Sequence, residues 1–178
     1  MKRYLTIVLI AGAAVMAAAP ALRGAQDKPE ALIESARQAL GTPQPATEAI
    51  TKALVDALSA SLLILPKTDY AEEYKSRIES VRKMVKEGAM LSDKAYQDLG
   101  TAYKLVSGGK TWEIPAELKA PGSGKKGIEK AAEVCGKLLD AALAERKAGR
   151  NEEAVRDLLS FVILVVTPME AEARPPAE

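Results

Sequence analysis

The chain has no histidine and only one cysteine, Cys135, among its 178 residues. Without histidine it cannot form a Ser-His-Asp or Cys-His catalytic group, a His-ligated zinc site or a histidine-based pH switch. Without a second cysteine it cannot form an internal disulfide, so packing must supply its stability. The sequence therefore predicts no catalytic residues, no metal site and no cofactor. It favours a non-enzymatic role over the alternative, an enzyme that works without histidine.

Aromatic residues are also scarce, with one Trp, five Tyr and one Phe in the whole chain. A β-sandwich usually carries more of them, because aromatic and β-branched side chains suit pleated strands. Ala, Leu, Lys and Glu are abundant instead, and these residues favour helices. The composition therefore predicts an all-α protein.

Charge of one sign is not in excess, since 25 Lys and Arg residues face 24 Asp and Glu residues. Nucleic-acid binding requires clustered cations that displace counterions from the phosphates. The mixture of both signs along this chain argues against such a partner.

The first 21 residues have the pattern of a cleavable signal peptide. Lys2 and Arg3 form a basic start, residues 4–22 are uncharged, and Ala19 and Ala21 have the −3 and −1 spacing that signal peptidase accepts. The cut is expected after Ala21, or as late as residue 25. An uncleaved anchor is the alternative, because the uncharged run is just long enough to span a bilayer. We expect export to a bacterial periplasm or the extracellular space, with no stable membrane span after cleavage.

The remaining chain predicts one helical domain over residues 27–167, with a disordered tail at 168–178. Apolar residues recur at helical spacing, and Gly or Pro punctuates the segments. The pattern favours an antiparallel bundle of five to six helices, in which the second and last helices are central. Cys135 falls on an apolar helix face, so an inert, buried thiol is expected. The main helices are expected at about residues 27–40, 47–65, 70–87, 92–107, 128–147 and 152–166.

Residues 110–127 interrupt this pattern and contain the only tryptophan, Trp112. A long irregular connection is uncommon in a compact domain and is often functional. Tryptophan is enriched where proteins bind partners. We therefore single out Trp112, with Lys110 and Ile114 beside it, as a candidate binding surface. The alternative is that Trp112 folds back as a lid over an open end of the bundle.

The glycine-rich end of this connection, before the helix expected from residue 128, contains Lys125 and Lys126. It departs from the phosphate-loop pattern, because Lys119 and Lys126 stand where that pattern needs Gly and Ser or Thr. A weaker anion site is the alternative, since free N–H groups at a helix N-terminus attract anions. A solvated linker is the simpler interpretation.

Two short stretches resemble parts of tetratricopeptide repeats. Tyr96, Leu99, Gly100 and Tyr103 are similar to the start of such a repeat, and residues 148–155 are similar to its turn and second helix. No 34-residue period joins the two stretches, and Pro115 stands where the first should continue into a second helix. The resemblance implies a helical-hairpin adaptor as an alternative. The main expectation is a bundle that binds a protein partner or a small apolar ligand near Trp112.

Overall fold

A computed structural model describes residues 4–5, 28–41, 45–65, 68–88, 92–119, 125–167 and 169–170. Apart from Tyr4, Leu5, Met169 and Glu170, the expected signal peptide and tail lie outside the described residues. Two short strands, β1 (Tyr4–Leu5) and β2 (Met169–Glu170), pair in antiparallel register. Everything else with regular structure is helical: α1 (Pro29–Ala39), α2 (Thr47–Ile64), α3 (Ala71–Lys86), α4 (Asp93–Val106), α5 (Ala116–Lys119), α6 (Lys125–Lys147) and α7 (Asn151–Val166).

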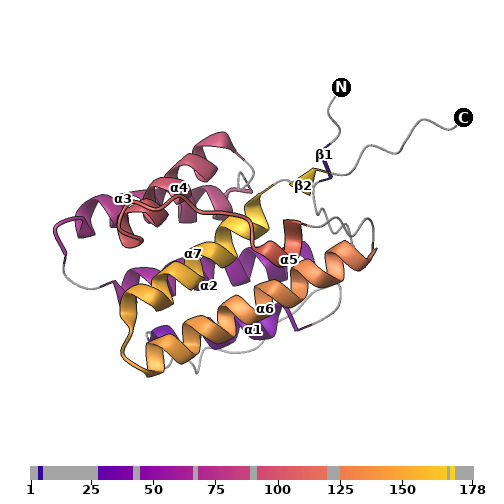
Figure 1. The fold of residues 1–178 in the computed structure, drawn as a ribbon, viewed down its shortest axis with the longest axis horizontal. Helices are drawn as coiled ribbons and strands as arrows, with labels where there is room; N and C mark the ends of the chain where they lie inside the picture. The colour runs from indigo at the N-terminus through magenta and orange to yellow at the C-terminus, as the bar shows by residue number, and fades with distance from the viewer. Residues whose placement is uncertain are drawn as a thin grey trace, which may run out of the picture.

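Within the described residues, the six longer helices form two rows of three (Figure 1). One row holds α1, α2 and α3, and the other holds α6, α7 and α4. The rows meet as α1 packs on α6, α2 on α7 and α3 on α4. The predicted all-α antiparallel bundle is therefore confirmed, with α2 and α7 in the middle of their rows.

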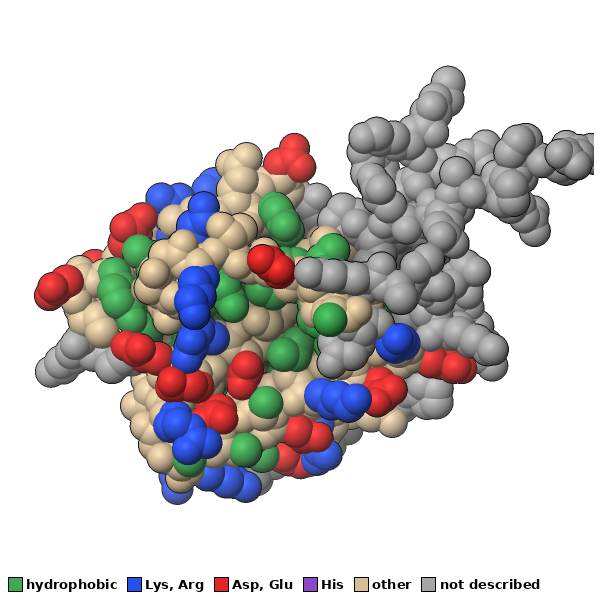
Figure 2. All heavy atoms as spheres, viewed as in Figure 1, with side chains coloured by type: hydrophobic (Ala, Val, Ile, Leu, Met, Phe, Trp, Pro, Cys, Tyr) green, Lys and Arg blue, Asp and Glu red, His purple; other side chains and the backbone are tan. Residues whose placement is uncertain are grey.

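The visible face of the bundle carries Lys and Arg side chains interspersed with Asp and Glu (Figure 2). None of the helices in the described parts of the chain is long and apolar enough to cross a membrane.

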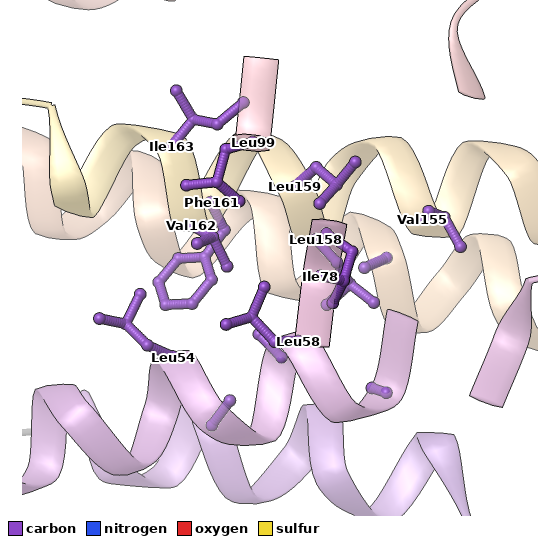
Figure 3. Close-up of a cluster of buried hydrophobic side chains, with 14 of the residues drawn as sticks. Leu54, Leu58, Ile78, Leu99, Val155, Leu158, Leu159, Phe161, Val162 and Ile163 are labelled. Atoms are coloured by element: carbon purple, nitrogen blue, oxygen red, sulfur yellow. The ribbon is translucent and has the colours of Figure 1, made fainter. Parts of the chain in front are cut away.

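The core lies where α2 and α7 meet the helices on either side (Figure 3). Leu54 and Leu58 of α2 face the side chains of α7, and Ile78 and Leu99 approach from α3 and α4. All four are fully buried. Burying each such side chain contributes about 1.5–3 kcal/mol relative to exposure, so this contact holds the two rows together.

The apolar run 161–166 in α7 is rich in β-branched residues, yet it is helical as expected. Every residue from Phe161 to Leu164 is at most 4% exposed. Burial on several sides, rather than local propensity, decides the conformation of this segment. The helix ends at Val166, and the backbone N–H of the next residue, Thr167, donates to the Ile163 carbonyl at 2.8 Å.

Two apolar side chains lie differently from the sequence pattern. The apolar run at residues 62–65 predicts a helix end buried on all sides. Leu63 is nevertheless 53% exposed, because among the described helices α2 packs mainly on α1, α3 and α7. The helical spacing of Tyr96 with Leu99 and Tyr103 predicts that it lies in the buried stripe of α4, but it is 45% exposed. The buried face of α4 is turned away from Tyr96 and contains Asp98 instead.

Some helix ends also differ from the expected ones. The capping patterns at Asp69 and Asn151 predict that these residues cap α3 and α7. The N-caps are instead Tyr70 and Arg150, and neither makes a side-chain cap hydrogen bond. Asn151 is the first residue of α7 and accepts a hydrogen bond from Arg146 at 2.8 Å. Ser92 does cap α4, accepting from the Ala95 N–H at 3.2 Å. Helix α6 begins at Lys125, three residues before the expected start at 128.

Candidate functional site

The chain leaves α4 through a tight turn that fixes the start of the 110–115 segment. Gly108 and Gly109 have φ angles of 67° and 90°, which L-residues with side chains rarely adopt. The Gly109 N–H donates to the Lys104 carbonyl at 2.8 Å, and the Ser107 hydroxyl donates to the Lys110 carbonyl at 2.9 Å. In Figure 1 the chain then turns back and runs along the bundle to α5, which lies against α6.

The three side chains expected to form a binding surface differ in their burial. Trp112 is half-buried and packs against the hydrophobic core. Ile114 is 41% exposed, and Lys110 is exposed. Trp112 therefore anchors the segment, while Ile114 and Lys110 offer an apolar and a cationic group to solvent.

The second expected site, at Lys125 and Lys126, coincides with the first turn of α6. The backbone position fits the expectation of a helix N-terminus there. The side chains of both lysines lie outside the part of the chain that the structure describes. The anion site therefore stays a prediction.

Asp98 is a buried carboxylate that the sequence pattern did not reveal. Its side chain is only 3% exposed and lies between α3 and α4. Oδ1 accepts from Arg77 Nη1 at 2.8 Å, and Oδ2 accepts from Lys94 Nζ at 2.7 Å and Ser80 Oγ at 3.2 Å. Burial alone would raise the pKa of Asp98, but the hydrogen bonds from Lys94, Arg77 and Ser80 outweigh it and lower the pKa. The carboxylate is fully satisfied, so this cluster is a structural tie between two helices.

Asp157 in α7 has the opposite environment. Burial raises its pKa to about 6, and the negative charge of Glu145 adds to the effect. Arg156 opposes the increase, whereas Glu153 adds to it. Arg156 already has a carboxylate partner, since it contacts Glu153 at 3.0 Å, and Glu145 is itself paired with Arg150. Asp157 is therefore the carboxylate here whose protonation is most readily changed near neutral pH.

Ser35, Lys52 and Asp56 form the arrangement closest to a histidine-free catalytic group. Lys52 Nζ donates to Ser35 Oγ and lies 2.5 Å from Asp56 Oδ2. A serine nucleophile activated by lysine needs a desolvated, neutral amine as base. The Lys52 side chain is 54% exposed and ion-paired. The three residues therefore tie α1 to α2 and give the enzyme alternative no support.

Cys135 is buried, as expected for an inert thiol. Burial raises the pKa of its thiol to about 12, so the reactive thiolate is disfavoured at neutral pH. Across the described residues, no three His, Cys, Asp or Glu side chains gather closely enough to hold a metal ion.

Comparison of the chain with protein-family models, with curated proteins and with solved structures finds no match. The function must therefore be argued from the chain's own residues.

Proposed function

We propose that the chain is an exported, non-enzymatic binding protein that contacts a protein partner through its 110–115 segment. The observation that carries this proposal is the exposed Ile114 on a segment that Trp112 fixes to the core. A held segment loses little conformational entropy on binding, and an exposed apolar side chain gains by burial. Lys110 adds a cation at the same place, which suits a partner with an acidic rim.

The interaction is tested by cross-linking in envelope extracts with tagged variants. Ile114→Lys should lose at least one partner that the wild type recovers, because the charge opposes burial of this surface. Leu63→Lys is the matched control, since Leu63 is also an exposed apolar residue, 53% against 41% for Ile114, and lies on α2, in the opposite row from the segment. If wild type and both variants recover the same proteins, the 110–115 segment is not the contact.

Trp112→Ala tests the same surface through its anchor. Removing a half-buried tryptophan should loosen the segment and cost roughly 2 kcal/mol of unfolding free energy. We expect partner recovery to fall as well. If the variant keeps every cross-linked partner, Trp112 serves packing alone and the proposed contact must lie elsewhere.

Export is proposed on the signal-peptide pattern of residues 1–21. Intact mass of the protein purified from the expressing bacterium should correspond to a chain that begins after Ala21, or as late as after Ala25. Recovery of the full-length chain from the cytosol would contradict export, without bearing on the 110–115 surface.

The tetratricopeptide-like adaptor receives less support from the packing. Repeat arrays stack successive units in one direction, each contacting its neighbours. Here α7 packs on α2 and on α4, so the last helix returns to the first half of the chain.

A further inference from the structure

A hollow of about 350 Å³ opens between the second half of α1 and the middle of α6. Small-molecule sites commonly have volumes of about 300–1,000 Å³. The hollow shares no residue with the 110–115 segment. Its walls are formed by Glu34, Arg37, Gln38, Leu40, Gly41, Ala132, Gly136, Leu139 and Asp140.

An ion pair joins the two helices at the hollow. Arg37 Nε lies 2.6 Å from Asp140 Oδ1, and Arg37 Nη2 donates to Asp140 Oδ2 at 3.2 Å. These two contacts hold the guanidinium in place and neutralise its charge. Glu34 is 4.0 Å from Arg37 Nη1, which is the outer limit of an ion pair. Two carboxylates therefore share one cation, and the walls carry a net charge of −1.

The inner surface of the hollow is small and apolar. Leu139 is fully buried and Leu40 is partly buried against the core. A Cβ atom added to Gly136 would meet no other atom within 4 Å. Packing of α6 therefore does not require glycine at this position, and a larger side chain would occupy the hollow.

We propose that this hollow binds a small organic cation, an amine on a short apolar chain. The ammonium group complements Glu34, the carboxylate with the weakest pairing, and the apolar chain covers the exposed part of Leu40. A carboxylate ligand would meet two acidic side chains around an arginine that is already neutralised. A neutral ligand would shield Glu34 from water without providing a new partner, which disfavours its binding.

The test is a titration of the ¹⁵N-labelled protein with butylamine, with butanol and butyrate as matched ligands. Butylamine should cause saturable shifts of the Gly136 and Leu139 amide signals, and the other two should not at equal concentration. Glu34→Gln should weaken butylamine binding by about tenfold, as expected for loss of one charge-assisted contact. Glu133→Gln is the matched control on α6, because Glu133 pairs with Lys137 at 2.6 Å and does not line the hollow. This variant should bind butylamine as the wild type does.

Filling the hollow provides a second arm of the test. Gly136→Leu should abolish the butylamine shifts. If the leucine variant does not fold, Gly136→Ser takes its place and should reduce the shifts. The proposal is overturned if butylamine causes no saturable shift, if all three ligands act alike, or if a folded Gly136→Leu variant still binds. Ile114→Lys should leave butylamine binding unchanged, so this result is independent of the proposed protein contact.

Discussion

Two carboxylates on inward-facing helix surfaces, Asp98 and Asp157, have opposite environments. Asp98 accepts hydrogen bonds from Arg77, Lys94 and Ser80, which together lower its pKa despite burial. Burial raises the pKa of Asp157 to about 6, and Arg156, which opposes the increase, is paired with Glu153. A buried carboxylate therefore stabilises the fold where hydrogen-bond donors pair with it, and it costs free energy where they do not.

Of the substitutions that test this comparison, the one at Asp98 should have the largest effect on stability. Asp98→Asn should reduce the free energy of unfolding by about 2 kcal/mol at pH 7, because the charge that Arg77 and Lys94 surround is removed. Urea denaturation of wild type and variant measures the difference. Glu79→Gln, at an exposed carboxylate on α3, is the control and should change stability by less than about 0.5 kcal/mol.

The pH dependence of this difference follows from the lowered pKa of Asp98. Its stabilising charge is fully present above the unfolded-state value of 3.8 and is lost as pH falls towards the lower folded-state pKa. The difference in free energy of unfolding between wild type and Asp98→Asn should therefore decrease only below about pH 4. An equal loss of stability for Asp98→Asn and Glu79→Gln would show that the buried cluster contributes nothing specific.

The smaller, opposite effect is expected at Asp157. Asp157→Asn should raise the free energy of unfolding by about 1 kcal/mol at pH 8, because it removes a charge that burial disfavours. This magnitude is reduced for the partial exposure of the side chain. Asp93→Asn, at an exposed residue in the first turn of α4, is the control and should not stabilise the protein.

The sign of the pH effect at Asp157 is the reverse of that at Asp98. Because its folded-state pKa is about 6 and its unfolded-state value is 3.8, the folded protein binds the proton more readily between these values. The ionisation penalty is complete above about pH 6 and disappears as pH falls through this window. The gain in free energy of unfolding from Asp157→Asn should therefore decrease as pH falls from 7 to 4. A constant advantage over this range would mean that the charge of Asp157 is not its cause.

The comparison of Asp98 with Asp157 also shows which features of the fold could be predicted from the sequence. Helical spacing and Gly or Pro punctuation predicted five to six helices and the central positions of α2 and α7, because burial of apolar stripes determines both. The buried face of α4 was misplaced, since Asp98 looks like a surface residue until the donors from α3 are in position. Tyr96 was assigned to the core for the same reason. The 110–115 segment was recognised as irregular, but nothing in its sequence tells that Trp112 faces inward and Ile114 outward.

The smallest expected effects are those of removing each of the two cations around Asp98 separately. Arg77 reaches Asp98 from α3 and is 40% exposed, whereas Lys94 lies on α4 itself, one turn before Asp98, and is 66% exposed. Arg77→Met should lower the free energy of unfolding more than Lys94→Met does, because more exposed pairs are weaker. Each loss should largely vanish in the Asp98→Asn background, which a double-mutant cycle measures.

A matched reference for these cations is Lys83→Met on α3, because Lys83 is 77% exposed and only 3.9 Å from Glu87. This variant should change the free energy of unfolding by less than about 0.3 kcal/mol in either background. If Lys94→Met proves as costly as Arg77→Met, the link within α4 matters as much as the link between helices. If neither loss depends on Asp98, the two cations act through the apolar stems of their side chains, and the contrast between Asp98 and Asp157 is then one of packing rather than of charge.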